Sequence, residues 1–198
     1  YLKDNFLEVG AGKGGLAMVY KKLLKNITLI EPDKNLFKIL KKKFKDKNIS
    51  LENKSIKNVK KKFNTIIYFD VLEHIKNDLL EVKTASKKLK PGGYLIFSVP
   101  AYQIFYSEFD KSVGHYKRYN KNDFRIISKK SDLEIEKILY YDSIGFLFLV
   151  VNKIFSLGSG NLKLKISLWN FLIPISKIID LLTFHKFGKS LICILKKK

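Results

Sequence analysis

The chain has 198 residues, of which 46% are hydrophobic and 29% charged, so one folded domain is expected and disorder is excluded. Its single cysteine excludes a disulfide framework, and its three histidines lie too far apart in sequence to predict a metal site. The net charge of +21 comes almost entirely from lysine, whereas nucleic-acid grooves favour arginine, so a solvated lysine surface is expected and no specific nucleic-acid partner.

The sequence begins at Tyr1 rather than at a methionine, and a motif follows within ten residues, so we expect the natural N-terminus to be missing and a single domain to cover residues 1–198. No uninterrupted apolar run reaches about 18 residues, so no membrane-spanning helix is predicted.

Short apolar runs alternate with helical patterns along most of the chain. Strands are predicted at residues 6–9, 27–30, 49–51, 65–69, 94–99, 133–141 and 191–195. Helices are predicted at residues 16–24, 36–44, 77–89 and 122–131. Strands that alternate with helices are joined by right-handed crossovers. The order therefore predicts an α/β fold, with a Rossmann-like, mostly parallel seven-stranded sheet and helices on both faces.

Residues 143–186 break this alternation and predict an apolar helical insertion before the last strand. Its first half is nearly all apolar, and its second half has polar residues at three- and four-residue steps. These polar positions are Lys163, Ser167, Asn170, Lys177 and Asp180. The spacing predicts one polar helical face opposite a broad apolar face. With one acid against five lysines, we expect the insertion to contact an anionic membrane surface or an apolar acceptor; the alternatives are core packing or a homodimer.

The segment E-V-G-A-G-K-G-G at residues 8–15 lies between a predicted strand and a predicted helix. Gly10, Gly12 and Gly15 satisfy the pattern G-x-G-x-x-G, and Glu31 ends the second strand about 20 residues later. Glycines allow a tight turn and a close approach of a ligand to the backbone, and the acid can hold two ribose hydroxyls. The motif therefore predicts a site for a nucleotide-like cofactor, either NAD or S-adenosyl-L-methionine.

Two further segments decide between these cofactors. D-V-L-E-H-I at residues 70–75 follows the fourth strand, and L-K-P-G-G-Y-L-I-F at residues 89–97 leads into the fifth. Together with the glycine segment and Glu31, they resemble the class I S-adenosylmethionine-dependent methyltransferases in order and spacing. The resemblance implies that Glu8, Gly10, Gly12 and Gly14 contact the methionine end of the cofactor and that Glu31 contacts its ribose. It also implies contacts from Asp70 and Val71 after the fourth strand, and from Ser55 at the position where many members have an aspartate near the adenine.

A dense polar and aromatic segment at residues 107–119 follows the fifth strand, where α/β sheets place substrates. Its D-x-x-x-G-H-x-x-R-Y pattern, beginning at Asp110, resembles a bacterial subgroup of these methyltransferases that is associated with cell-surface glycan or lipid-linked precursors. A histidine suits the removal of a proton from a hydroxyl, so we predict His115 as general base and Arg118 as the residue that holds an anionic group. The alternative is that both only fix the loop through hydrogen bonds to Asp110.

Four further residues are predicted on the substrate side. His74 either faces the substrate or caps the next helix. Tyr102, Tyr116 and Tyr119 are predicted as walls of the pocket rather than as acids.

The sequence thus predicts an enzyme, a methyltransferase that uses S-adenosyl-L-methionine to O-methylate a small or lipid-linked glycan acceptor. We expect this enzyme to be cytoplasmic and peripheral at the inner membrane face. Methylation of nucleic-acid bases is disfavoured, because D-V-L-E at residues 70–73 replaces the Asn/Asp-Pro-Pro-aromatic run of such enzymes. Two alternatives remain open. One is an NAD-binding oxidoreductase, although no Tyr-x-x-x-Lys set is present. The other is a non-catalytic membrane-surface or partner-binding module of the same fold.

Overall fold

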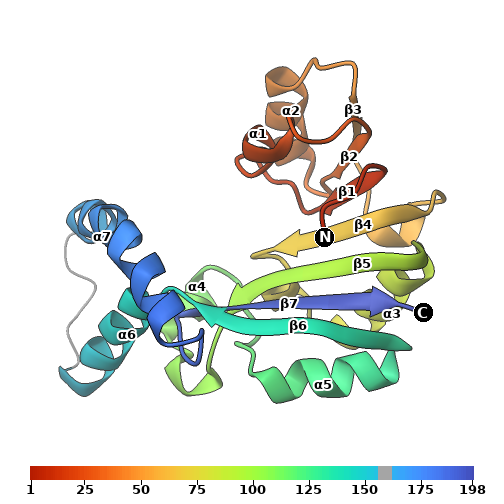
Figure 1. The fold of residues 1–198 in the computed structure, drawn as a ribbon. Helices are drawn as coiled ribbons and strands as arrows, with labels where there is room; N and C mark the ends of the chain where they lie inside the picture. Colours follow the sequence, from red (N-terminus) through yellow and green to blue (C-terminus); the bar gives the residue numbers. More distant parts are fainter. Residues whose placement is uncertain (156–161) are drawn as a thin grey trace.

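The computed structural model describes residues 1–155 and 162–198, and the side chains of the second range from residue 171 onward. One sheet of seven strands has the order β3-β2-β1-β4-β5-β7-β6 (Figure 1). The strands are β1 (Phe6–Val9), β2 (Ile27–Ile30), β3 (Ile49–Glu52), β4 (Phe63–Phe69), β5 (Leu89–Pro100), β6 (Leu133–Tyr141) and β7 (Ser190–Lys197). The helices are α1 (Ala17–Tyr20), α2 (Lys34–Lys43), α3 (Asp78–Lys87), α4 (Glu108–Ser112), α5 (Lys121–Lys130), α6 (Ser143–Phe155) and α7 (Leu162–Leu182).

The predicted seven-stranded α/β sheet is confirmed, and its strands run in mixed directions. Four of the six strand pairings are parallel, and β7 runs antiparallel to both of its neighbours, β5 and β6. Because the parallel strands β1, β2, β3, β4 and β5 all end at one edge of the sheet, the loops that follow them meet there. Ligands of open α/β sheets bind at this edge.

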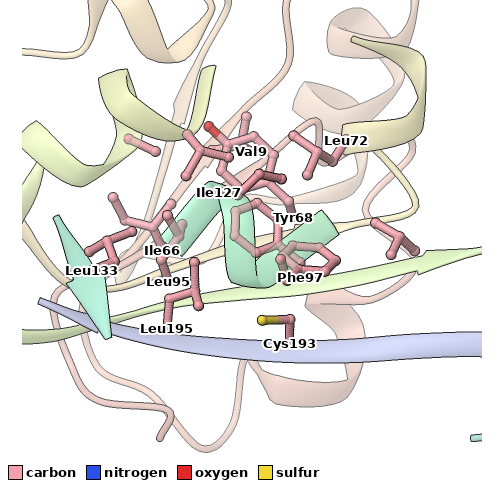
Figure 2. Close-up of a cluster of buried hydrophobic side chains, with 14 of the residues drawn as sticks. Val9, Ile66, Tyr68, Leu72, Leu95, Phe97, Ile127, Leu133, Cys193 and Leu195 are labelled. Carbon is pink, nitrogen blue, oxygen red and sulfur yellow. The ribbon is translucent and has the colours of Figure 1, made fainter. Parts of the chain in front are cut away.

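Two hydrophobic clusters cover the two faces of the sheet. Successive side chains of a strand point to opposite faces, and Ile66 accordingly joins one cluster while Ile67 joins the other. Figure 2 shows the first cluster, which includes Ile66, Tyr68, Leu95, Phe97, Ile127 and Cys193. It packs against α3 and α5, whereas the second cluster contains Tyr20 of α1 and Leu40 of α2. Burial on both faces explains why the central strands are continuous apolar runs.

Single capping side chains set the starts of two of the predicted helices. The side chain of Asp33 accepts hydrogen bonds from the backbone at the start of α2, and Asn77 does the same for α3. The helix predicted at residues 16–24 is wrong in length, because α1 ends at Tyr20. The chain then turns toward β2, and the Asn48 side chain binds the carbonyl of Leu24 in this turn, at 3.1 Å.

The helical insertion predicted between the last two strands is present as α6 and α7, which project beyond the sheet (Figure 1). The predicted polar positions do not share one environment: Asp180 is 5% exposed and accepts hydrogen bonds from the backbone nitrogens of Asp142 and Ser143 at 2.9 Å, whereas Lys177 is exposed. Ser176 is buried beside Asp180. The side chains predicted polar at 163, 167 and 170 lie outside the described residues. The α7 carboxylate therefore faces inward because it caps the first turn of α6.

Within the described ranges, no helix combines the length and the apolar character that crossing a membrane requires.

Candidate functional site

The loop between β1 and α1 has the backbone geometry that its glycines predict. Gly10, Gly12 and Gly14 have φ angles of 68°, 55° and 71°, which L side chains rarely adopt. A Cβ atom at Gly10 would lie 2.7 Å from the Val71 side chain, and one at Gly14 would lie 2.2 Å from the Phe44 ring. At Gly12 a Cβ atom would meet no described atom within 4 Å. Packing therefore requires two of these glycines, and the third faces open space in which a ligand can approach the backbone.

Glu31 lies directly beside this loop, although 19 residues separate it from Gly12 in sequence. Its carboxylate accepts a hydrogen bond from the Gly12 nitrogen at 2.8 Å and another from the Asp33 nitrogen at 2.9 Å. Ser55 follows β3 at the start of a short 3₁₀ turn, and the neighbouring Asn53 side chain binds the Glu31 carbonyl at 2.7 Å. The residues predicted at the ribose and near the adenine thus follow the adjacent strands β2 and β3.

Glu8 has a contact that the sequence analysis missed. Its side chain is buried and accepts a hydrogen bond from the Tyr20 hydroxyl of α1. Burial raises the pKa of Glu8 to about 7, and the Tyr20 hydrogen bond opposes this rise. The observed partner of Glu8 is therefore a core tyrosine, and its contact with a cofactor stays a prediction.

The turn after β4 brings a second set of polar groups to the same edge of the sheet. Asp70 has a φ angle of 52°, a conformation that is uncommon outside glycine, and a 3₁₀ turn at Leu72–His74 follows it. Glu73 in this turn has a side chain that is 1% exposed, and burial raises the pKa of Glu73 to about 8. Among the described residues, its Oε2 atom has no hydrogen-bond partner. A fully buried carboxylate oxygen without a partner costs free energy, which makes this atom a marker for a missing ligand or proton.

Asp110 organises the loop after β5. Its buried carboxylate accepts hydrogen bonds from Arg118 Nε and Nη2, both at 3.0 Å, and from His115 Nδ1 at 2.9 Å. Burial alone would raise the pKa of Asp110, but the bonds from Arg118 and His115 hold it below its usual value. Arg118 and His115 therefore both bind Asp110, which is the alternative that the sequence left open for them. The prediction that Arg118 holds an anionic substrate group is corrected, because its side chain is 6% exposed and its fork is engaged by Asp110.

The fold also brings His74 and His115 together, although 41 residues separate them in sequence. Their rings lie 4.7 Å apart, at 78° to each other. His115 Nε2 is 4.0 Å from Glu73 Oε1, and Glu73, His74 and His115 each offer one ligand atom within 4.8 Å of the others. The sequence analysis excluded a metal site from histidine spacing and missed this cluster. The available signal was that both histidines follow strands that end at the same edge.

The three predicted tyrosines have different surroundings. Tyr102 is partly buried, with a φ angle of 60°, and stacks on Tyr140 at 4.7 Å between ring centroids. Tyr116 is 56% exposed, and its place in the wall of a pocket stays a prediction. Tyr119 is fully buried, and its hydroxyl donates to the Leu72 carbonyl at 3.2 Å. The prediction for Tyr119 is therefore wrong, because this residue belongs to the core and anchors the loop.

Comparisons with known proteins agree with this geometry. A family model described as a methyltransferase domain matches residues 2–145. No curated protein matches the sequence. Many solved structures have a similar fold, and three of them illustrate the range.

The first is an S-adenosylmethionine-dependent methyltransferase from Clostridium acetobutylicum, with 15% identity, a TM-score of 0.64 and coverage of 99% of this chain and 85% of that chain. The second is an N-methyltransferase from Bradyrhizobium japonicum in complex with S-adenosyl-L-homocysteine, with 13% identity, a TM-score of 0.62 and coverage of 98% and 78%. The third is a Haloferax volcanii complex between a methyltransferase and the Trm112 methyltransferase activator, with 8% identity, a TM-score of 0.67 and coverage of 98% and 84%. At these identities the likeness concerns the fold.

Proposed function

The chain belongs to the methyltransferase-domain family, and on this premise we propose that it transfers the methyl group of S-adenosyl-L-methionine to an oxygen of a small or lipid-linked glycan acceptor. One observation carries the proposal: the Glu31 carboxylate lies against the Gly12 nitrogen, beside open space at that glycine. These groups fit a ribose-bearing cofactor, because the carboxylate keeps lone pairs for two hydroxyls. The family also sets aside the alternative of an NAD-dependent oxidoreductase.

When bound, the cofactor supplies an electrophilic methyl group on a sulfonium, and the sulfur leaves as a neutral thioether. The protein has to align the acceptor oxygen, exclude water and accept the proton of the hydroxyl. We propose that His115 lies next to this hydroxyl and that its Nε2 accepts the proton as a general base. Asp110 and Arg118 hold the imidazole in place, and His74 lies against it. Tyr102 and Tyr116 are proposed to border the acceptor.

Replacement of Glu31 tests the cofactor site. Glu31→Ala removes a charged acceptor, and each charge-assisted hydrogen bond contributes about 1.5–3 kcal/mol, so calorimetry is expected to show an affinity for S-adenosyl-L-methionine about tenfold weaker or more. Glu31→Gln is the second variant, because it keeps one acceptor for the Gly12 nitrogen. Glu134→Ala on β6 is the matched control, since its side chain is 61% exposed. An unchanged affinity in both Glu31 variants, with the fold intact, would refute the site.

Helices α6 and α7 support a second proposal, which concerns the surface at which the protein binds its acceptor. The outer surface of α6, α7 and the following turn carries large apolar side chains, here called the apolar hairpin face. It consists of Leu147, Phe148, Val151, Ile154, Phe155, Phe171, Ile175, Ile178, Leu181, Leu182 and Phe184, each at least 41% exposed. The polar groups of α7, Ser176 and Asp180, point inward instead. Exposed Lys153, Lys177 and Lys186 accompany this face, and none of them faces an exposed acid on α6 or on residues 171–182 of α7.

We therefore propose that the apolar hairpin face contacts an anionic membrane surface at its cytoplasmic side, where a lipid-linked acceptor would be reached. Apolar side chains flanked by lysines are the composition that binds the boundary between headgroups and acyl chains. A neutral small acceptor would not require the lysines beside this face.

Liposome binding tests this proposal. The protein is expected to cosediment with phosphatidylglycerol vesicles at low salt and to be released as salt rises, because headgroup attraction is screened. A triple serine variant at Phe171, Leu182 and Phe184, which are 72–80% exposed, is expected to lose binding by about tenfold or more. Leu23→Ser is the matched control, since Leu23 is 74% exposed but follows α1. A dimer that the triple variant dissociates, without any vesicle binding, would establish the homodimer alternative instead.

A further inference from the structure

One cluster of side chains consists of Glu73, His74 and His115, and the proposed methyl transfer assigns a reacting role only to His115. Each side chain offers one ligand atom, and these atoms lie within 4.8 Å of one another. Glu73 Oε2 is buried and, within the described part of the chain, has no hydrogen-bond partner. Native structures rarely leave a buried carboxylate oxygen unpaired unless a ligand, an ion or a proton is bound there. We propose that Glu73, His74 and His115 bind one first-row divalent cation, with zinc as the best fit, and that this cation holds the acceptor oxygen.

The distances suit a site that closes slightly on binding. Zinc bonds of about 2.0–2.1 Å place two ligand atoms about 3.4 Å apart around a tetrahedral ion. His115 Nε2 and Glu73 Oε1 are 4.0 Å apart, so one ion between them requires only a small side-chain movement. The His74 ring already lies against His115, where it also hydrogen-bonds the Gly114 backbone.

The surroundings of His115 are those of a metal-binding histidine. Its Nδ1 donates a hydrogen bond to Asp110 at 2.9 Å, because an ionised carboxylate can only accept. Nε2 then keeps its lone pair, and this nitrogen is the atom that faces Glu73. A carboxylate that orients the outer nitrogen of a ligating imidazole is a recurrent arrangement around protein-bound zinc. Arg118 in turn fixes the carboxylate of Asp110 through two hydrogen bonds.

The donor set also selects the kind of cation. Two imidazoles and one carboxylate favour zinc and similar transition metals over magnesium or calcium, which prefer oxygen ligands. Three protein ligands leave an open position, as in catalytic rather than structural zinc sites. Although the chain has a net charge of +21, the Asp70 carboxylate lies near this cluster and favours an additional positive charge, whereas Arg118 balances Asp110.

The site lies where the methyl acceptor has to be. Val71, two residues before Glu73, packs against Gly10 of the cofactor loop, so the cluster is next to that loop. This inference rests on the proposed function: the acceptor hydroxyl would occupy the open position, and a bound divalent cation lowers the pKa of such a hydroxyl. Its proton leaves to water, the oxygen–methyl bond forms and the methyl–sulfur bond breaks. His115 then acts as a ligand of the cation rather than as the general base.

The test is zinc binding by the full chain without an affinity tag, measured by calorimetry against a competing chelator. One zinc per chain is expected, and Co²⁺ at the same site is expected to give a visible absorption band. His74→Ala, His115→Ala and Glu73→Gln should each weaken zinc binding about tenfold or more. His185→Ala is the matched control, because His185 lies after α7 and its Nδ1 contacts the Tyr140 carbonyl. His74 is exposed, so its variant is expected to keep the fold even where the buried Glu73 variant does not.

The same samples separate failure of this inference from failure of the proposed function. Affinity for S-adenosyl-L-methionine is expected to stay unchanged in the three ligand variants. Absence of zinc binding, or zinc binding that His74→Ala and His115→Ala leave intact, would overturn the cation site and return His115 to the role of general base. A wild-type chain that does not bind S-adenosyl-L-methionine would instead overturn the methyltransferase proposal.

Discussion

Replacing His115 by alanine is expected to lower the rate of methyl transfer by about 10²–10⁴-fold at neutral pH, while the affinity for S-adenosyl-L-methionine remains that of the wild type. The rate and the cofactor affinity are expected to respond separately because His115 lies in the loop after β5, whereas the predicted cofactor contacts lie in β1 or follow β1, β2, β3 and β4. The rate is measured as formation of S-adenosyl-L-homocysteine in an extract that contains lipid-linked glycans.

His185→Ala is the control for this rate measurement, because it removes an imidazole from the turn after α7 and leaves the cluster intact. His74→Ala adds a second comparison, since it removes the ring that lies against His115. A His115→Ala variant that retains the full rate would show that His115 only fixes its loop. A variant that loses the rate and the cofactor affinity together would place His115 in the cofactor site instead.

The fold was predictable from the sequence because its signals are local. Apolar runs indicate the buried strands, and single side chains such as Asp33 and Asn77 fix where helices begin. The cofactor loop was predictable for a similar reason. Gly12 and Glu31 are 19 residues apart and follow adjacent parallel strands, so the strand order alone brings the carboxylate to the glycine nitrogen.

The cluster around His115 was not predictable because it depends on contacts between distant segments. Glu73 and His74 contact His115 only after the loop beyond β5 folds back on the turn after β4, whereas Asp110 lies in the same loop as His115. Likewise, the motif does not distinguish Tyr119 from the other two tyrosines predicted as pocket walls. Its burial follows from the Ala101–Tyr119 bridge, which ties the loop to the end of β5.

The orientation of the helices in the insertion could not be predicted from the sequence either. Periodicity reveals that a helix has a polar and an apolar face, but not which face points outward. In α7 the carboxylate of Asp180 binds the backbone nitrogens of Asp142 and Ser143, so Asp180 is buried while Lys177 on the same helix is exposed. The two helices were therefore predictable, and the burial of Asp180 was not.

Replacing Asp110 by alanine is expected to destabilise the protein by about 3–5 kcal/mol, because the Arg118 guanidinium would remain buried without a counter-charge. The side chains of Asp110 and Arg118 are 1% and 6% exposed and are joined by two hydrogen bonds of 3.0 Å. Denaturant unfolding measures the loss. Glu108→Ala is the matched control: it breaks a Lys111–Glu108 pair whose side chains are 72% and 93% exposed, and a change of about 0–1 kcal/mol is expected.

The double variant Asp110→Leu with Arg118→Met distinguishes the effect of Asp110 on protein stability from its effect on the orientation of His115. Removing both charges eliminates the unpaired guanidinium, so much of the stability lost in Asp110→Ala is expected to return. The rate of methyl transfer is expected to stay low, because His115 Nδ1 would still lack the acceptor that orients its ring. If the double variant regained the full rate as well, the carboxylate would be needed only to balance Arg118, and His115 would reach its place without Asp110.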